Sequence, residues 1–318
     1  MSDVQVLAMP RQSPLYMKSL QAAYTVHQAL HETDPAAFAK IAPSIRAIAA
    51  SGESKVPESL MAQLPALEIV SVMGVGYDGV DAIAAKARGV MVTHTPDVLN
   101  DDVADLALAL MLAASRQIPA ADRYVREGSW LKGAMPLQRK MSGARVGIVG
   151  MGRIGKAIAM RALAFGMSVA YTARTAKPEL PYAFHPTAAA LAAQVDFLVV
   201  ITPGGAGTRK LIDAQVLQAL GKGRGEGIVV NVARGSVIDE AALIDALQRG
   251  VIAGAGLDVF EDEPRVPRAL CDLQHVVLTP HVGSATHGTR QAMADLAFDN
   301  LRLRLAGQPV RTPVPECR

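Results

Sequence analysis

Short apolar runs rich in valine and isoleucine alternate along the chain with longer stretches rich in alanine and leucine. Apolar runs of about 4–8 residues predict buried strands, and longer stretches with helical spacing of apolar positions predict helices. The expected strands are residues 4–8, 68–73, 90–93, 145–149, 168–171, 197–201, 227–232, 254–259 and 275–279. Helical patterns fall between them, for example at residues 156–165 and 240–248. This alternation indicates an α/β fold with doubly wound parallel sheets.

Two helical stretches are longer than the others. Residues 100–117 are unusually apolar for a surface helix, so they predict a buried helix that links two domains, with Asn100 or Asp101 as its cap. Residues 283–305 form the second stretch, which suggests that the chain crosses back and that its C-terminal end rejoins the first domain. A length of 318 residues is sufficient for two domains of ordinary size.

The composition is that of a compact soluble protein, with 50% hydrophobic and 19% charged residues. The net charge is only +3 and no dense Lys/Arg run occurs, so neither a nucleic-acid partner nor a membrane surface is supported. Cys271 and Cys317 have neither metal-ligand nor disulfide spacing, so we expect no metal and a reducing compartment. Without a signal-peptide pattern or an apolar window of about 18 residues, the chain is expected to be cytoplasmic.

The pattern Gly-x-Gly-x-x-Gly occurs twice, at residues 74–79 and 150–155. Only the second lies between an apolar strand and a helix that leads to another strand, which is the context of a dinucleotide-binding turn. Its glycines permit a tight turn and close approach to a pyrophosphate, which then faces the N-terminus of the helix. The expected cofactor-binding residues here are Gly150, Met151, Gly152, Arg153, Ile154 and Gly155.

The residue that reads the ribose is expected about 20 positions further on, at the end of the next strand. Residues 171–177 read Tyr-Thr-Ala-Arg-Thr-Ala-Lys and contain no carboxylate that would accept a hydrogen bond from the 2′-hydroxyl of NAD. Arg174 and Thr175 offer a binding site for a 2′-phosphate instead. We therefore predict a preference for NADP(H) over NAD(H), the alternative being that Arg174 is a solvated loop residue.

Three residues with catalytic chemistry follow the nucleotide motif. Arg234 lies in Asn-Val-Ala-Arg-Gly-Ser, Glu263 in Asp-Val-Phe-Glu-Asp-Glu-Pro, and His281 in Thr-Pro-His-Val-Gly-Ser. A guanidinium can bind a substrate carboxylate, and an imidazole titrates near neutral pH and can donate a proton. A carboxylate on the second ring nitrogen would set the tautomer and favour the protonated ring. The set predicts hydride transfer to a small keto acid; His275 and His287 are interpreted as structural.

Taken together, these motifs resemble those of the D-2-hydroxyacid dehydrogenases, from about Ser71 to Leu301. The matching segments are residues 75–78, 94–105, 146–155, 233–239 and 280–286. Within that family the chain is most similar to the NADPH-dependent glyoxylate/hydroxypyruvate reductases and the related hydroxyphenylpyruvate reductases. The resemblance also selects Glu263 over Glu261 as the partner of the histidine.

The resemblance implies two doubly wound domains. Residues 99–285 would form the Rossmann dinucleotide-binding domain, and residues 1–98 with 286–318 a flavodoxin-like substrate domain. The active site would lie in the cleft between them. The implied reaction reduces a 2-keto acid to the D-2-hydroxy acid.

Further site residues follow only from the resemblance. The backbone N–H groups of Val75 and Gly76 would bind the substrate carboxylate together with Arg234 and His281. Asp258 would hold the nicotinamide carboxamide. Other residues near the cofactor would be Thr202, Val232, Ala233 and Gly283. A homodimer is implied, in which Trp130 either approaches the neighbouring subunit's site or simply packs in the interface.

Two alternatives remain open. One is an enzyme of the same family that acts on another 2-keto acid, such as an aryl pyruvate or a phosphoglycerate-type substrate. The other is a nucleotide-sensing binding protein without activity, similar to transcriptional corepressors of this fold, although we identify no peptide-docking surface in the sequence.

Overall fold

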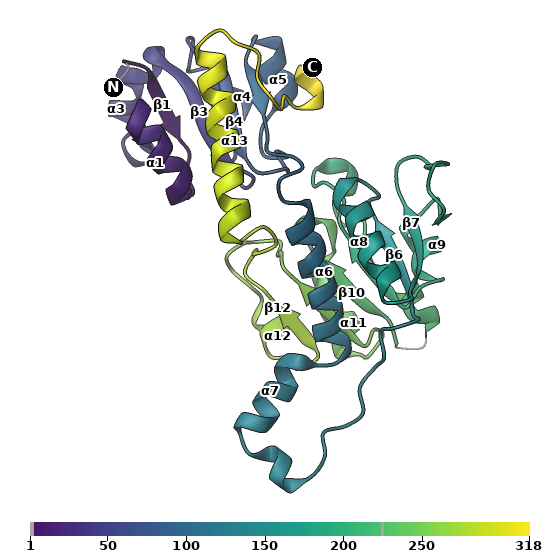
Figure 1. Ribbon diagram of the computed structural model, residues 1–318. Coiled ribbons are helices and arrows are strands. Elements are labelled where there is room, and N and C mark those ends of the chain that lie inside the picture. Colours follow the sequence, from purple (N-terminus) through teal and green to yellow (C-terminus); the bar gives the residue numbers. More distant parts are fainter. Residues whose placement is uncertain (1–2, 224–225) are drawn as a thin grey trace. The chain divides into compact units, whose positions relative to one another are not determined.

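The computed structural model describes residues 3–223 and 226–318. The chain divides into two compact units, which we call unit 1 (residues 1–99 and 286–318) and unit 2 (residues 100–285). The boundaries expected from the sequence, 98/99 and 285/286, lie within one residue of this division. Each unit contains one wholly parallel sheet with helices, so the expected α/β fold class is confirmed (Figure 1).

Unit 1 is built on a sheet with the strand order β2-β1-β3-β4-β5, which is the flavodoxin-like order. Its strands are β1 (Gln5–Ala8), β2 (Thr25–Gln28), β3 (Ile45–Ser51), β4 (Ile69–Met73) and β5 (Met91–Thr93). Its helices are α1 (Pro14–Ala23), α2 (Leu30–Thr33), α3 (Pro35–Ile41), α4 (Glu58–Met61), α5 (Ala82–Ala87) and α13 (His287–Leu305). Strands β2 and β3 were not predicted from the sequence, because β2 is a polar edge strand and β3 is rich in alanine.

Unit 2 contains a larger sheet with the order β12-β11-β10-β9-β6-β7-β8. Its strands are β6 (Arg145–Val149), β7 (Ser168–Thr172), β8 (Ala183–Phe184), β9 (Phe197–Val200), β10 (Ile228–Asn231), β11 (Gly254–Leu257) and β12 (Val276–Leu278). The order reverses between β6 and β9, and open α/β sheets bind ligands beside such a switch point. The glycine motif at residues 150–155 directly follows β6, so it lies at this point.

The helices of unit 2 connect these parallel strands. They are α6 (Asn100–Ser115), α7 (Ile118–Arg126), α8 (Arg153–Ala164), α9 (Ala188–Ala192), α10 (Ala214–Ala219), α11 (Glu240–Gln248) and α12 (Arg268–Cys271). Short 3-10 helices complete the two units: η1 (Ala42–Ser44), η2 (Ser129–Lys132), η3 (Ala206–Thr208), η4 (Leu220–Gly223), η5 (Gly235–Val237) and η6 (Pro315–Cys317).

Two expected helix starts were wrong. Helix α8 begins at Arg153, inside the glycine motif, rather than at residue 156. Helix α13 begins at His287 rather than at residue 283, because the side chain of Thr286 accepts the N–H of Thr289 and caps it. The long helix α6 is buried along one face, as expected for its apolar sequence.

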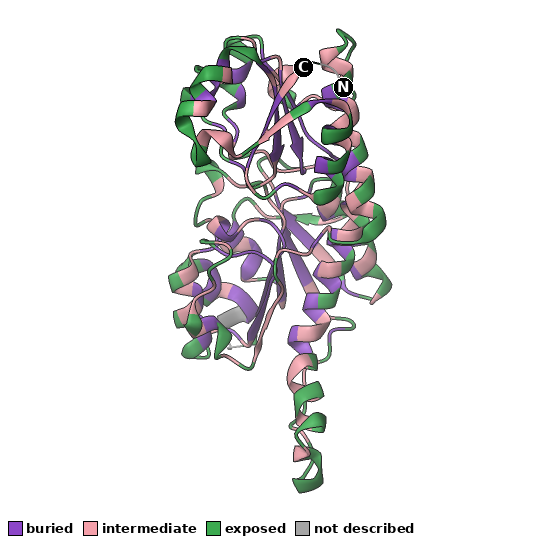
Figure 2. Ribbon diagram, turned by 90° about the vertical axis from the view of Figure 1, so that its left-hand side faces the viewer, coloured by how far each residue is buried: buried purple, intermediate pink, exposed green. Residues whose placement is uncertain are grey.

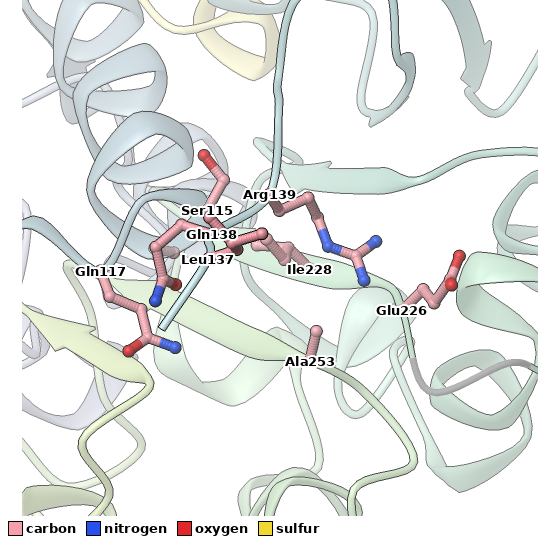
Figure 3. A pocket seen from close by; sticks show the side chains of 9 residues that line it. Ser115, Gln117, Leu137, Gln138, Arg139, Glu226, Ile228 and Ala253 are labelled. Atoms are coloured by element: carbon pink, nitrogen blue, oxygen red, sulfur yellow. The ribbon is translucent and has the colours of Figure 1, made fainter. Parts of the chain in front are cut away.

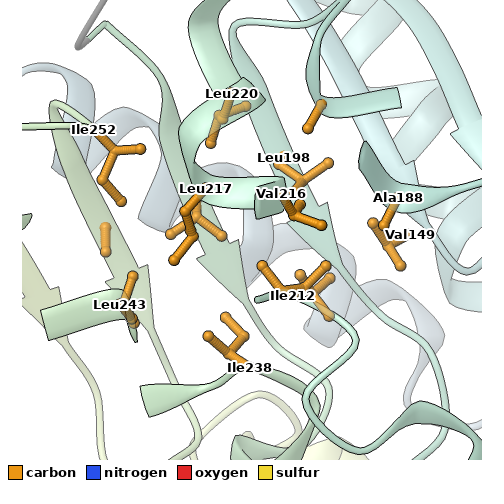
Figure 4. Packing of buried hydrophobic residues seen from close by; sticks show 14 of the residues in the cluster. Val149, Ala188, Leu198, Ile212, Val216, Leu217, Leu220, Ile238, Leu243 and Ile252 are labelled. Atoms are coloured by element: carbon orange, nitrogen blue, oxygen red, sulfur yellow. The ribbon is translucent and has the colours of Figure 1, made fainter. Parts of the chain in front are cut away.

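Each unit has its own hydrophobic core, in which the central strands of its sheet are buried (Figure 2). In unit 2, Leu198, Val229 and Ala255 of neighbouring strands are fully buried, and Leu217 of α10 packs in the same cluster (Figure 4). Burial on both faces explains why these strands read as continuous apolar runs.

A helical arm leaves the body of unit 2 between α6 and β6. It consists of α7, η2 and the extended segment that follows, and its residues are mostly exposed (Figure 2). No single helix among the described residues has the length and apolar character needed to cross a membrane. The bent pair α6 and α7, with 57° between its members, meets that requirement by length and composition only.

Candidate active site

Most of the expected site residues of unit 2 follow strands of one parallel sheet. Gly150 follows β6, Thr202 follows β9, Arg234 follows β10, Asp258 follows β11 and His281 follows β12. Parallel strands present their carboxyl ends at the same edge, so the fold brings these residues to one side of unit 2.

The glycines of the motif at residues 150–155 have different structural roles. Gly150 has φ +106°, and a Cβ there would lie 2.8 Å from the carbonyl oxygen of Ile201. A Cβ on Gly155 would lie 2.2 Å from the oxygen of Gly150. Nothing lies within 4 Å of the corresponding position on Gly152, the N-cap of α8. This open approach to a helix N-terminus fits the pyrophosphate of a dinucleotide.

The first glycine motif, at residues 74–79, lacks that arrangement. Helix α5 begins only at Ala82, and its N-terminus is occupied by the carboxylate of Asp81, which accepts the N–H of Ala84. A carboxylate at this end would repel a phosphate group. A Cβ on Gly79 would lie 2.2 Å from the oxygen of Ser54, so this glycine allows two loops to pack closely.

The loop after β7 carries Arg174 and Thr175, both exposed. Tyr171, the fourth residue of β7, is buried, and its hydroxyl accepts the N–H of Lys177 at 2.7 Å. The same hydroxyl donates to the carbonyl of Lys177 at 3.3 Å, which closes the loop. The first carboxylate after β7 is Glu179, so the loop offers basic and hydroxyl groups where NAD-specific sites have an acid.

The loop that carries Arg234 is held by a buried asparagine at the end of β10. The Asn231 amide donates to the carbonyl of Arg234 at 3.0 Å, and its oxygen accepts the N–H of Ala233 at 3.0 Å. Gly235 packs against Phe260, where a Cβ would lie 1.9 Å from the carbonyl carbon. Only glycine fits there, so Gly235 brings the Arg234 loop close to the segment that leads to Glu263.

Glu263 and His281 form a direct pair. Nδ1 of His281 lies 2.7 Å from Oε2 of Glu263, and the other carboxylate oxygen accepts the N–H of Phe260 at 2.9 Å. Burial raises the pKa of the Glu263 carboxyl. The hydrogen bond and charge of His281, with smaller contributions from Phe260 and Arg234, outweigh it, so the pKa lies below its ordinary value. Glu263 is therefore a carboxylate that orients the imidazole.

Asp258 supports the turn on which His281 lies. Its buried carboxylate accepts the hydroxyl of Thr279 at 2.7 Å and the N–H groups of Val282 and Gly283 at 2.8 Å each. Its carbonyl accepts the N–H of His281 at 2.9 Å. His281 itself has φ +53°, a conformation that few side chains adopt, so the turn needs this support. The expected contact of Asp258 with the nicotinamide carboxamide stays a prediction.

The other expected residues lie in different parts of the fold. Val232 and Ala233 are buried at the end of β10, and Gly283 is buried beside Asp258. Val75 and Gly76 belong to unit 1, where they follow β4. Trp130 lies in η2 of the helical arm and is 67% exposed.

A cavity of about 380 Å³ in unit 2 lies away from these residues (Figure 3). It is lined by Ala114, Ser115, Gln117, Leu137, Gln138, Arg139, Glu226, Ile228 and Ala253. Ile228 is the first residue of β10, and Ala253 immediately precedes β11. The cavity is therefore at the amino ends of the strands, and the glycine loop, Arg234 and His281 are at the carboxyl ends.

Comparisons with known proteins agree with this arrangement. Residues 108–283 match the family model described as the NAD binding domain of D-isomer specific 2-hydroxyacid dehydrogenase. Glyoxylate/hydroxypyruvate reductase A of Arabidopsis thaliana is 48% identical over 85% of this chain and 86% of its own length. Hydroxyphenylpyruvate reductase of Plectranthus scutellarioides is also 48% identical, over 86% of each chain.

Among solved structures, the NADPH-dependent glyoxylate/hydroxypyruvate reductase of Sinorhizobium meliloti superposes with a TM-score of 0.92. It is 45% identical over 99% of this chain and 98% of its own, and it was solved in complex with NADP and malonate. The family expected from the sequence motifs is confirmed. The chain belongs to the D-isomer specific 2-hydroxyacid dehydrogenases, NAD(P)-dependent oxidoreductases that interconvert 2-keto and 2-hydroxy acids.

Proposed function

We propose that this chain reduces glyoxylate, hydroxypyruvate or a closely related 2-keto acid to the D-2-hydroxy acid, with NADPH as the preferred cofactor. The observation that carries the proposal is the hydrogen-bonded pair of His281 and Glu263 at 2.7 Å, at the same edge of unit 2 as Arg234. The names of the similar reductases support the choice of substrate.

His281 is the proton donor in this reaction. Glu263 binds Nδ1, so the proton on Nε2 is the one that passes to the carbonyl oxygen of the substrate. The carboxylate of Glu263 also fixes the orientation of the imidazole. When bound, the reduced nicotinamide supplies the hydride that adds to the carbonyl carbon.

The substrate carboxylate is bound by two kinds of donor. The guanidinium of Arg234 offers a planar fork of N–H groups that matches a carboxylate and polarises the adjacent carbonyl. The backbone N–H groups of Val75 and Gly76 in unit 1 form the second donor set, as in an anion-binding nest.

The preference for NADPH rests on the loop after β7. Arg174 and Thr175 are exposed directly after this strand, and no carboxylate precedes Glu179. A guanidinium binds a 2′-phosphate through charge-assisted hydrogen bonds, and no acid is present to repel it. The NADP in the S. meliloti reductase complex supports the same choice.

A second substrate class is favoured by one relative. The hydroxyphenylpyruvate reductase of P. scutellarioides is as similar to this chain as the A. thaliana reductase is. An aryl pyruvate is therefore the alternative substrate, bound by the same Arg234 and protonated by the same His281.

We also propose that the chain acts as a homodimer through the helical arm. Trp130 and Leu131 of η2 are 67% and 94% exposed, and Ile118, Val125 and Leu137 of the same arm are exposed as well. Exposed apolar side chains gathered in one segment are typical of an interface.

The test is NADPH oxidation followed at its absorbance band over a panel of glyoxylate, hydroxypyruvate, phosphohydroxypyruvate and 4-hydroxyphenylpyruvate. We expect the highest kcat/KM for one of the first two. His281→Gln should reduce the single-turnover rate by about 10²- to 10⁴-fold, the usual contribution of a general acid, while NADPH still binds. Absence of turnover with every keto acid would favour a nucleotide-sensing binding protein.

A further inference from the structure

In unit 1, the loop that carries Val75 is held through its carbonyl groups. The N–H of Thr95 donates to the carbonyl of Gly74 at 2.8 Å, and Nδ1 of His94 lies 2.9 Å from the carbonyl of Val75. A carbonyl can only accept, so Nδ1 of His94 carries the proton. Gly74 also packs closely against Gly52, where a Cβ would lie 3.0 Å from the facing Cα.

Tyr77, two residues after Val75 in this loop, packs its ring against the ring of His94. The two rings meet edge to face, with centroids 5.4 Å apart and an interplanar angle of 83°. The Tyr77 hydroxyl donates to Oε2 of Glu316 at 2.9 Å. Burial, then the hydrogen bond and charge of Glu316, raise the pKa of Tyr77 to about 12, so the hydroxyl remains a donor at neutral pH.

Glu316 belongs to a C-terminal segment that is itself anchored. Val314 is fully buried, and its N–H donates to the carbonyl of Val92 in β5 at 3.0 Å. The Thr312 hydroxyl donates to the carbonyl of His94 at 2.6 Å and accepts the amide of Asn300 at 2.7 Å. The same segment ends in η6, which packs against α5 (Figure 1). The C-terminal segment therefore contacts His94 in two ways. Thr312 binds the His94 carbonyl directly, and Glu316 binds Tyr77, whose ring packs against the His94 ring.

We propose that Glu316, Tyr77 and His94 are positioning residues for substrate binding: they hold the loop so that the N–H groups of Val75 and Gly76 point at the substrate carboxylate. This inference rests on the proposed function of that loop. The consequence is that the C-terminal segment controls affinity for the keto acid, although it carries none of the reacting groups.

The first test breaks the tyrosine–glutamate hydrogen bond from each side. Tyr77→Phe removes only the hydroxyl, Glu316→Ala removes the acceptor, and Glu316→Gln keeps an acceptor oxygen. We expect the first two to raise KM for the keto acid about fivefold, the usual effect of one hydrogen bond, with kcat within about twofold. Glu316→Gln should stay near the wild type. The Tyr77→Phe/Glu316→Ala double variant should be no worse than either single variant, because both remove the same bond.

The second test removes the histidine donor. His94→Phe keeps a ring against Tyr77 but cannot donate to the carbonyl of Val75, so KM should rise further than in Tyr77→Phe. The matched control is His27→Phe. His27 lies 2.7 Å from Gln5 in a side-chain hydrogen bond, but on the opposite edge of the same sheet. This control should leave KM unchanged.

Malonate binding by calorimetry to the NADP⁺-saturated protein gives a readout that does not require turnover. If wild-type protein binds malonate and the variants bind it about fivefold more weakly, positioning is supported even where keto-acid reduction fails. Unchanged KM and malonate affinity in Tyr77→Phe, Glu316→Ala and His94→Phe would overturn the inference. Equal losses in kcat, NADPH affinity and thermal stability would also overturn it, because they would indicate a purely structural role. If the wild-type protein reduces keto acids but binds no malonate, the KM values of the three variants decide the question.

Discussion

At the scale of single residues, each proposed catalytic side chain of unit 2 is held by a specific neighbour. Asn231 holds the loop of Arg234, the N–H of Phe260 holds the carboxylate of Glu263, and Asp258 holds the turn of His281. Reacting groups must stay within a narrow range of positions for catalysis, so the proposed mechanism depends on these neighbours as well.

The Glu263–His281 pair predicts a pH-dependent contribution to stability. The pKa of Glu263 is lowered in the folded state, so the pair stabilises the fold above the ordinary carboxyl pKa of about 4.3. That contribution is lost as the pH falls through the lowered pKa. The difference in free energy of unfolding between wild type and Glu263→Gln should therefore shrink as the pH falls below about 4.3.

Denaturant unfolding at a series of pH values measures this difference. The control is the same substitution in a His281→Gln background, where most of the pH dependence should disappear because the partner is absent. A difference that is the same at every pH would contradict the ion pair.

We predict that Arg174 sets the preference for NADPH over NADH. Arg174→Asp replaces a donor by a carboxylate that repels a 2′-phosphate and can accept from a 2′-hydroxyl. The ratio of kcat/KM for NADPH to that for NADH should fall by about tenfold or more, mainly through KM for NADPH. Arg249→Asp is the control, since this exposed arginine caps the C-terminus of α11, which joins β10 to β11 in the other half of the sheet from β7. Unchanged selectivity in Arg174→Asp would refute the NADPH assignment at this residue.

At the scale of elements, two glycines serve different purposes: we expect Gly152 to matter for cofactor binding and Gly235 for folding. Gly152 lies at the N-terminus of α8 and faces open space, whereas Gly235 begins η5 and contacts the backbone of Phe260. The same substitution at the two positions should therefore have opposite consequences.

Gly235→Ala should destabilise the protein by about 1–3 kcal/mol or more, because its Cβ would overlap the Phe260 backbone. Gly152→Ala should leave the melting temperature of the cofactor-free protein nearly unchanged but weaken NADPH binding about tenfold or more. Thermal unfolding and NADPH titration on both variants test the pair of statements. Destabilisation by Gly152→Ala without loss of NADPH affinity would contradict them.

At the scale of the whole molecule, the chain passes between its two units only at residues 99/100 and 285/286. Unit 2 carries the nucleotide motif, the catalytic candidates and the helical arm, and unit 1 carries the Val75–Gly76 loop. The proposed function assigns roles to residues of each unit and includes the pairing of two copies.

We predict that the exposed apolar side chains of the helical arm hold the dimer together. Leu131→Asp together with Leu137→Asp places charges on two exposed apolar positions of the arm and should convert a dimer into a monomer. Light scattering coupled to size-exclusion chromatography measures the mass. Ile83→Asp, at an exposed apolar position on α5 of unit 1, is the control and should remain dimeric. A monomeric wild type would refute the proposal.

The elements that sequence patterns predicted well are those with a strong local signal. β6, β9 and β11 are buried apolar strands, and their predicted ranges cover the observed ones. The alanine-rich strand β3 was missed because alanine also favours helices, and β8 was missed because two residues make no pattern. NADPH preference, the homodimer and a cytoplasmic location stay predictions.

Local sequence was sufficient for the α/β class and for proposing the dinucleotide turn and the candidate reactive groups, since each of these patterns lies in residues that are neighbours in the chain. The contacts that orient those groups depended on the three-dimensional fold. Tyr77 meets Glu316 from 239 positions away, and Gly235 meets Phe260 only because β10 and β11 are adjacent. Strand order and long-range packing set such contacts, and neither is encoded in the periodicity of any single segment.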